Sequence, residues 1–490
     1  MSKLNWGKLA CAVFILCATT AIALPAQTFR VVQSFDGTDG SWPGAGLVQA
    51  TNGNLYGTTA AGGANTTGCY GNGCGTVFKI TPSGTLTTLH SFCSQSTCTD
   101  GAEPSAALVQ AADGNFYGTT PAGGAYGQGT VFKITPGGEL TTLYNLCSQS
   151  NCTDGAEPSA ALVQATGGNF AFYGTTYAGG SYGSGTVFKI TPSGALTTLH
   201  SFCSQSYCMD GAQPLAGLIQ ATDGNFYGTT YGGDYNYGTV YKITPSGTLT
   251  TIYTFGSQNS DGANPLAGLV QAADGNFYGT TSAGGTNAWG TVFKITPTGT
   301  LTTLYSFCSQ GGCTDGVYPD AGLVQATDGN LYGTTLYGGF DSFGTIFKIT
   351  PNGTLTTLYN FCSRDFCTDG IFSEAGLIQD TNGRLYGTTD NGGAYGWVHG
   401  YGTVFTLSMG LGPFVETQPT SGAVGKPVKI LGTNLTGATS VTFNGTQAVL
   451  KVVSSSLIIT TVPQGATTGK VQVTTPGGVL TSNVPFRVRP

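Results

Sequence analysis

The sequence predicts an all-β chain in which a seven-bladed β-propeller is followed by an immunoglobulin-like β-sandwich. Three observations support this fold class. The chain contains a repeated unit of about 54 residues, each unit contains four strand-like runs, and the strand that the last unit lacks is found before the first. The string Y-G-T-T marks the repeat and begins at seven positions: Tyr56, Tyr117, Tyr173, Tyr227, Tyr278, Tyr332 and Tyr386.

The unit that starts at Ala107 illustrates the four strands. Their expected ranges are 107–111, 115–120, 129–135 and 140–146. Asp113-Gly114-Asn115 and Pro136-Gly137-Gly138 supply tight turns between them. The run V-F-K-I is apolar at successive positions, which predicts that both faces of its sheet are buried, as when blades stack around an axis.

The two ends of the repeat region favour a closed ring over a linear solenoid. The L-T-T-L type of outer strand occurs only six times. Residues 28–35 precede the first unit and end in Ser-Phe, like the outer strands that end at Ser91-Phe92 and Ser306-Phe307. We expect 28–35 to pair with 402–407 and complete the last blade. A linear array would need polar caps at its ends instead.

The order of the strands places the two kinds of loop on opposite faces. The tight D-G-N and P-S-G turns share one face. The Gly-rich loop after Y-G-T-T and the C-S-Q-S-x-C-T-D-G-A segment share the other, which we call the long-loop face. Because loops that vary carry function, any ligand is expected on the long-loop face.

A glutamine occupies the same innermost position in every unit. Such residues could line the channel or form hydrogen bonds between blades, and the second role is favoured because buried amides need partners. The seven positions are Gln49, Gln110, Gln164, Gln220, Gln271, Gln325 and Gln379.

The N-terminus and the charge indicate a secreted protein, periplasmic or extracellular. Lys3 and Lys8, the apolar run 9–24 and the small residue Ala26 are typical of a signal peptide spanning 1–26, with a membrane anchor as the alternative. Without 1–26 the chain holds 15 basic and 23 acidic side chains, a net charge of −8. This balance excludes nucleic acid as a partner, because phosphate contacts need clustered Lys and Arg.

Twelve cysteines remain after 1–26, and they form six C-x4-C pairs. We expect local disulfides, since the fifth unit lacks both cysteines of a pair together. Zinc is the alternative, but no second pair or histidine stands at metal-binding spacing. Each bond closes a short loop and contributes about 2 kcal/mol in the chain-entropy model. The expected pairs are Cys69 and Cys74, Cys93 and Cys98, Cys147 and Cys152, Cys203 and Cys208, Cys308 and Cys313, and Cys362 and Cys367.

No catalytic residue, metal site or cofactor is predicted. Seven similar blades cannot each be an active site, and no non-repeating group of polar residues is evident. His90 and His200 stand where other units have Tyr, which indicates strand packing, and His399 is unique but has no partner in the sequence. The Asp-Gly pairs fit ordinary turns, with calcium binding as the alternative.

Aromatic residues recur in the Gly-rich loops of the long-loop face. Such a ring could stack on sugar faces or on a protein partner, or simply pack the loops. The predicted ligand-binding residues are Tyr126, Tyr182, Tyr235, Trp289, Phe340, Tyr395 and Trp397.

The segment 413–490 shows short alternating strands that predict the sandwich. The run from Pro419-Thr420-Ser421-Gly422 through Gly432-Thr433-Asn434-Leu435, followed by V-T-F-N-G at 441–445, resembles the IPT/TIG family of immunoglobulin-like domains. That resemblance implies a spacer or binding module without activity.

The repeat of 27–409 resembles the GloVer tandem repeat of secreted bacterial proteins, through G-L-V-Q-A-x-D-G-N-x-Y-G-T-T and G-T-V-F-K-I-T-P-x-G. The family carries varied C-terminal anchoring segments, and this chain shows no apolar and basic tail after the sandwich. The resemblance implies no catalytic residue.

We therefore expect a monomeric extracellular binding or scaffold protein with carbohydrate or protein as partner. Two alternatives stay open: a propeller enzyme acting on polysaccharide, and a structural component of the cell surface. A cluster of non-repeating polar groups in one cleft would favour the enzyme.

Overall fold

The computed structural model describes residues 27–66, 69, 71–166, 170–233, 236–258 and 260–489. The expected signal peptide at 1–26 lies outside this range. Within it, no helix has both the length and the apolar character needed to cross a membrane.

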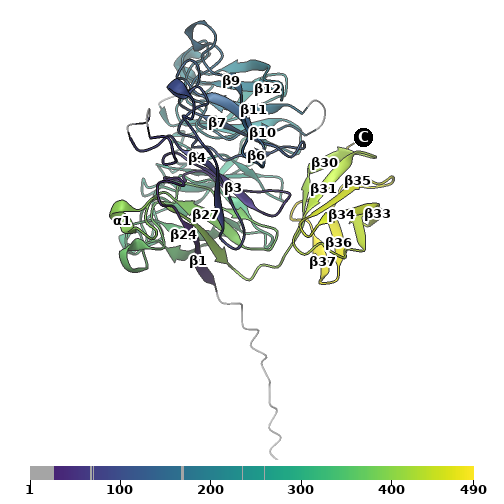
Figure 1. Ribbon diagram of the computed structural model, residues 1–490. Helices are drawn as coiled ribbons and strands as arrows, with labels where there is room; N and C mark the ends of the chain where they lie inside the picture. Colours follow the sequence, from purple (N-terminus) through teal and green to yellow (C-terminus); the bar gives the residue numbers. More distant parts are fainter. Residues whose placement is uncertain are drawn as a thin grey trace, which may run out of the picture.

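Seven four-stranded antiparallel sheets form the repeat region (Figure 1). The innermost strands are β2 (Val48–Gln49), β6 (Val109–Gln110), β10 (Val163–Gln164), β14 (Ile219–Gln220), β18 (Val270–Gln271), β22 (Val324–Gln325) and β26 (Ile378–Gln379). The second strands are β3 (Leu55–Thr59), β7 (Phe116–Thr120), β11 (Phe172–Thr176), β15 (Phe226–Thr230), β19 (Phe277–Thr281), β23 (Leu331–Thr335) and β27 (Leu385–Thr389).

The third and outer strands complete each sheet, and we number the blades 1 to 7 in this order. The third strands are β4 (Thr76–Ile80), β8 (Thr130–Ile134), β12 (Thr186–Ile190), β16 (Thr239–Ile243), β20 (Thr291–Ile295), β24 (Thr345–Ile349) and β28 (Thr403–Ser408). The outer strands are β5 (Leu86–Ser91), β9 (Leu140–Asn145), β13 (Leu196–Ser201), β17 (Leu249–Thr254), β21 (Leu301–Ser306), β25 (Leu355–Asn360) and, in blade 7, β1 (Thr28–Ser34).

The predicted closure of the ring is confirmed. Strand β1 pairs antiparallel with β28, from Thr28 opposite Ser408 to Ser34 opposite Thr403. The two ends of the repeat region therefore share blade 7, and no blade is left with an unpaired third strand.

The Y-G-T-T string is explained by contacts within and between blades. Tyr117 stacks on Phe172 of the next blade at 4.1 Å between ring centroids. A Cβ on Gly118 would lie 2.6 Å from the Phe132 ring, so only glycine lets that ring pack against β7. The Thr119 hydroxyl donates to the carbonyl of Ala160 in the next blade at 3.0 Å. The tyrosine and the first threonine of the repeat thus serve the stacking of blades, and the glycine serves the packing within one blade.

The innermost strands have two residues each rather than the five expected, because only the Val-Gln or Ile-Gln pair of each forms the antiparallel pairing with the second strand. The glutamines form the hydrogen bonds between blades that the repeat predicted. Each Oε1 accepts a backbone N–H from the inner turn of the preceding blade, at 2.7–3.2 Å. Gln49 of blade 1 accepts from Thr381 of blade 7, so the seven bonds close into a ring.

We expect Gln379→Leu to lower the free energy of unfolding. Gln379 is buried, accepts from Thr327 N and donates to Gly383 O, so its loss leaves two backbone groups without these partners. The expected cost is about 1–3 kcal/mol, measured by urea denaturation. Gln205→Leu, at an exposed loop position, is the control and should stay within about 0.5 kcal/mol. Equal midpoints for the two variants would contradict the role of the ring.

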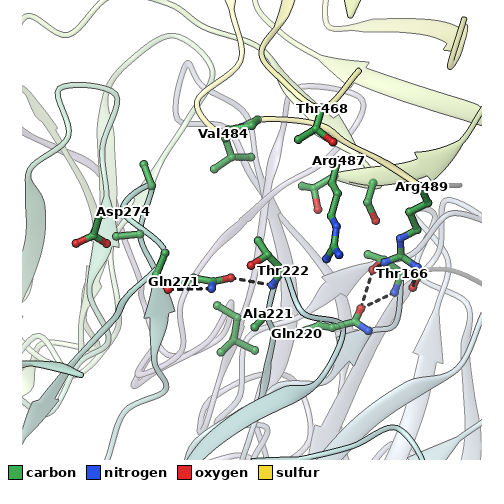
Figure 2. Close-up of a pocket in the computed structure, with 17 residues that line it drawn as sticks. Thr166, Gln220, Ala221, Thr222, Gln271, Asp274, Thr468, Val484, Arg487 and Arg489 are labelled. Carbon is green, nitrogen blue, oxygen red and sulfur yellow. Dashed lines mark hydrogen bonds between the residues drawn. The ribbon is translucent and has the colours of Figure 1, made fainter. Parts of the chain in front are cut away.

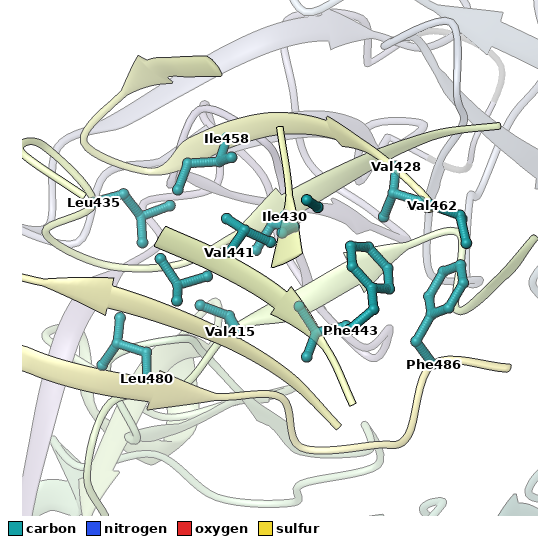
Figure 3. Close-up of a cluster of buried hydrophobic side chains, with 13 residues drawn as sticks. Val415, Val428, Ile430, Leu435, Val441, Phe443, Ile458, Val462, Leu480 and Phe486 are labelled. Carbon is teal, nitrogen blue, oxygen red and sulfur yellow. The ribbon is translucent and has the colours of Figure 1, made fainter. Parts of the chain in front are cut away.

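The C-terminal segment forms the predicted β-sandwich. One sheet has the order β29-β31-β35-β34 and the other β33-β32-β36-β37, with β30 and β38 paired in parallel beside them. Phe443 and Phe486 meet edge to face at 5.0 Å in the core, among Val and Ile side chains from both sheets (Figure 3). The strands are β29 (Glu416–Gln418), β30 (Ser421–Ala423), β31 (Pro427–Leu431), β32 (Ser440–Phe443), β33 (Thr446–Ala448), β34 (Leu450–Ser454), β35 (Leu457–Thr461), β36 (Val471–Thr475), β37 (Gly478–Thr481) and β38 (Arg487–Arg489).

The sandwich lies against the tight-turn face of the propeller. Ser456 donates to Thr51 O at 3.0 Å, Lys429 to Ala112 O at 2.8 Å, and Arg489 to Thr166 O at 2.8 Å. These acceptors are equivalent residues on the inner turns of blades 1, 2 and 3. Figure 1 shows the sandwich on the opposite side of the propeller from helix α1 (Gly396–His399), which belongs to a long loop. The long-loop face is therefore the face that the sandwich leaves open.

All six C-x4-C pairs are joined as disulfides. Five of them flank short 3₁₀ turns between blades: η1 (Ser96–Cys98), η2 (Ser150–Cys152), η3 (Ser206–Cys208), η5 (Gly311–Cys313) and η6 (Asp365–Cys367). Because disulfides persist in oxidising compartments, this is a non-cytoplasmic protein.

Candidate functional site at the junction of blades 6, 7 and 1

The aromatic residues predicted to bind a ligand are exposed on the long loops, with one exception that the structure does not describe. Tyr235 lies outside the described residues. Of the others, Trp289 meets Tyr318 edge to face, with 5.2 Å between ring centroids, and Tyr395 meets Tyr401 edge to face, with 5.6 Å between ring centroids. Tyr126, Tyr182, Phe340 and Trp397 are exposed. Nothing in the structure gathers all these rings around one point.

A second set of residues occupies equivalent positions in all seven blades, six residues before each innermost strand. One residue per blade occupies the left-handed region, with φ between 54° and 60°, just before the innermost strand. We call these seven positions the mouth residues. In blade order they are Trp42, Glu103, Glu157, Gln213, Asn264, Tyr318 and Phe372. Aromatic side chains occupy only blades 6, 7 and 1, which are neighbours in the closed ring.

The aromatic mouth residues continue into a chain of ring contacts. Trp289 contacts Tyr318, Tyr318 contacts Tyr337 at 6.1 Å, and Tyr337 contacts Phe372 at 5.1 Å. Tyr337 is exposed, while Tyr318 and Phe372 are partly buried. Trp42 is 45% exposed on blade 1. The aromatic surface therefore extends over blades 5 to 7, with Trp42 beyond it on blade 1.

Three carboxyl groups stand in the same sector. Burial and the nearby charge of Glu374 raise the pKa of Asp320 to about 7. Burial, and then Glu374, raise the pKa of Asp390 well above its usual value, and burial also raises the pKa of Glu374. The Glu374 and Asp390 side chains interact with each other, and like charges at this distance favour a proton on one of the pair. Gly44 leaves room for this pair, because a Cβ there would lie 3.3 Å from Asp390 Oδ1.

Two adjoining hollows lie at the junction of blades 7 and 1. A hollow of about 360 Å³ is lined by Trp42, Glu374 and Asp390, and a neighbour of about 500 Å³ is lined by Asp36, His399 and Tyr401. Trp42 and Asn391 line both. We call the two together the seam hollow. His399, unpartnered in the sequence, thus lines the hollow next to the one that contains the carboxyl pair.

No non-repeating polar cluster is evident in the sequence, whereas the structure forms one. The signal lies in the repeat columns: Asp390 stands where other units have Ala, Pro, Tyr, Ser or Leu, and Glu374 and Asp320 stand where others have Gly, Ser or Leu. These departures are distant in sequence. Only ring closure brings Trp42 of blade 1 beside Glu374 and Asp390 of blade 7.

The repeated aspartates have protein partners. In the D-G-N turn, Asp113 accepts from Asn115 and from the Tyr117 hydroxyl. In the segment between blades, Asp100 Oδ2 accepts from Ser94 and pairs with His90 Nε2 at 3.1 Å, as Asp210 does with His200. His90 and His200 therefore do more than pack a strand, since they anchor the loop that follows. The equivalent tyrosines, such as Tyr144, bind the same carboxylate.

Among the described residues, one group of side chains is spaced closely enough to hold a metal ion, and it consists of cysteines. The sulfur atoms of Cys69, Cys74 and Cys98 lie within 4.8 Å of one another. All three belong to disulfides, so they are not thiolate ligands.

Comparison with known proteins identifies both parts of the chain. The model of the Gloeobacter/Verrucomicrobia repeat matches residues 19–145, 69–273 and 231–447, and that of the IPT/TIG domain matches residues 415–488. No curated protein matches the chain.

Several solved structures are similar to the chain at low identity. Virginiamycin B lyase from Staphylococcus aureus is 12% identical, with 78% of this chain and 99% of that chain covered and a TM-score of 0.49. The extracellular domain of a putative hybrid two-component system from B. thetaiotaomicron is 12% identical, with a TM-score of 0.50. The match covers 94% of this chain and 58% of that chain. A fungal alcohol oxidase in complex with copper is 13% identical, with a TM-score of 0.49. The match covers 91% of this chain and 96% of that chain. These similarities concern the fold and transfer no activity.

Proposed function

The chain belongs to the Gloeobacter/Verrucomicrobia repeat family, and we propose that it is an extracellular binding protein that holds a carbohydrate in the seam hollow. The observation that carries this proposal is the position of Trp42. Its side chain is 45% exposed and lines both of the adjoining hollows, which also contain carboxyl, amide and imidazole groups.

The chemistry of the hollow suits a sugar ring. An aromatic face packs against the C–H groups of a sugar, and carboxyl and amide groups such as Glu374, Asp390 and Asn391 accept or donate hydrogen bonds to its hydroxyls. The volumes of about 360 and 500 Å³ are within the range of small-ligand sites.

The charge of the propeller argues for a neutral or cationic ligand. Residues 27–412 hold 9 basic and 22 acidic side chains. Acidic polymers would be repelled from the long-loop face, whereas neutral sugars would not.

A longer glycan would extend from the hollow over the loops of the same face. We propose the predicted aromatic residues Tyr126, Tyr182, Trp289, Phe340, Tyr395 and Trp397 as its outer contacts, because they are exposed on these loops. Tyr235 belongs to the same proposal by sequence.

The test is a glycan array on the purified chain, followed by calorimetry with the glycans that bind. We expect Trp42→Ala to weaken binding by about three- to tenfold, the magnitude of one lost stacking contact. Tyr207→Ala is the matched control, because Tyr207 is 84% exposed on a turn between blades and outside the hollow. Unchanged affinity in Trp42→Ala would place the ligand elsewhere, and an array without a binder would refute carbohydrate binding.

The carboxyl pair favours a second candidate, an enzyme acting on polysaccharide. Two interacting carboxyls with divided protonation can serve as general acid and base. If a bound glycan is also cleaved, Glu374→Gln should abolish the release of reducing ends while leaving binding measurable. Cleavage that persists in this variant would exclude the pair as the catalytic groups.

A further inference from the structure

We propose that the chain has a second binding site, in the cleft between the sandwich and the tight-turn face, and that its ligand is an acidic oligosaccharide held through carboxylate or sulfate groups. This inference is independent of the proposed function, because it concerns the opposite face and a ligand of opposite charge preference.

The cleft consists of two hollows that share their polar centre. One, of about 560 Å³, lies over blades 4 and 5, and the other, of about 540 Å³, extends toward blade 3. Arg487, Arg489, Thr166 and Gln220 line both. Together the hollows accommodate several sugar rings, with the two guanidinium groups at the middle.

The sandwich is basic, in contrast to the propeller. Residues 413–490 hold six basic side chains and one acidic side chain, Glu416. Three of the cations, Lys429, Arg487 and Arg489, face the tight turns of the propeller. Lys429 donates to the carbonyl oxygen of Ala112, and Arg489 donates to the carbonyl and hydroxyl oxygens of Thr166. These acceptors carry no charge, so they do not neutralise either cation.

Arg487 is available to a ligand. Its side chain is exposed and makes no hydrogen bond or ion pair with the residues that the structure describes, and Figure 2 shows it extending from the sandwich toward the propeller turns. Arg489 lies close enough for the two charges to interact: burial, and then Arg487, lower the pKa of the Arg489 guanidinium. Two neighbouring cations without a counter-ion are stabilised by an anion between them.

The carboxylates at the rim of the cleft do not supply that anion. Asp274 is paired with Lys294 at 3.0 Å, and Asp223 is paired with Lys242 at 3.1 Å. Each also accepts hydrogen bonds from an asparagine of its own turn and from a tyrosine of the strand that follows. The propeller side of the cleft is therefore locally balanced in charge, and the sandwich side is positive.

A buried hydroxyl points independently to a ligand. Ser421 is only 7% exposed, lines the cleft, and its Oγ has no hydrogen-bond partner among the described residues. Ser421 stands opposite Arg487 in the parallel pair of β30 and β38, so the two side chains lie on the same face. An unsatisfied buried hydroxyl costs free energy, which an oxyanion bound beside Arg487 would recover.

The test uses the mature chain and three trisaccharides: trigalacturonate, its neutral methyl ester, and a sulfated trisaccharide. We expect at least one of the two acidic sugars to bind, and the one that binds identifies the oxyanion. The methyl ester should bind at least about tenfold more weakly, because it lacks the charge-assisted hydrogen bonds.

Arg487→Gln is the informative variant, since its side chain takes no part in the contacts that hold the sandwich in place. It should weaken binding about tenfold without changing the melting temperature. Lys451→Gln removes the same charge from exposed strand β34, and Trp42→Ala alters only the seam hollow, so both should bind like the parent. Failure of both acidic sugars to bind, equal binding of acid and ester, or parental affinity in Arg487→Gln would overturn the proposal. A loss confined to Trp42→Ala would assign the acidic sugar to the other face.

Discussion

Deletion of residues 27–36 is expected to lower the melting temperature sharply or to prevent folding. Strand β1 supplies the whole outer edge of blade 7. Phe29 stacks on Tyr359 of blade 6 at 3.9 Å, and Phe35 is fully buried against Phe78 of blade 1 at 5.1 Å. The deletion removes both contacts and exposes the edge of β28, so it opens the ring.

Single substitutions give a graded version of the same test, in case the truncated chain does not fold. Phe35→Ala should cost about 3–5 kcal/mol of unfolding free energy, the usual result for a buried phenylalanine. Arg30→Ala, at an exposed position of the same strand, should cost less than about 0.5 kcal/mol. Melting curves that are the same for Phe35→Ala and Arg30→Ala would show that closure does not depend on this strand.

Stability is expected to fall as the pH rises from 5 to 8. Burial raises the pKa of Asp380 to about 7, and burial together with the charge of Asp380 raises the pKa of Glu416 to about 7. These two carboxyls meet where the sandwich joins the propeller. In the unfolded chain each would ionise near pH 4. Their raised pKa values therefore contribute stability at low pH that is lost as the pH rises from about 4 through about 7.

The expected loss between pH 5 and 8 is on the order of 3 kcal/mol for each carboxyl. Carboxyls with lowered pKa values, such as Asp274 at about 2, make the protein more stable as the pH rises, but this effect is confined to pH values below about 4. Chemical denaturation at pH 5 and at pH 8 measures the difference.

Asp380→Ala isolates the cause. Asp380 is 2% exposed and stands where the other six units have alanine, so the substitution restores the residue of the repeat. We expect this variant to be more stable than the parent at pH 8 and to show a flatter dependence on pH. Asp341→Ala, which removes an exposed charge from a loop, should keep the parental slope. A parental slope in Asp380→Ala would assign the pH dependence to other groups.

The repeat itself predicted the fold, the closing strand and the hydrogen bonds of the glutamines. Each of these follows from a pattern that recurs at a fixed interval, such as Y-G-T-T, or from one that is missing at one end and present at the other, such as the outer strand at 28–35. Regular patterns are visible in sequence because each blade meets the same packing requirement. The pairing of the cysteines was predicted for a similar reason, since both partners lie in one short loop.

The seam hollow and the cleft under the sandwich were decided by tertiary structure alone. Trp42 and Asp390 are separated by most of the chain, and they line one hollow only because β1 closes the ring. Arg487 and Gln220 come together only because the sandwich docks on the tight turns, through single contacts such as Lys429 with Ala112 that leave no pattern in the sequence. A repeat specifies what every blade shares, whereas each candidate site also depends on residues that depart from the repeat, such as Asp390, or lie outside it, such as Arg487.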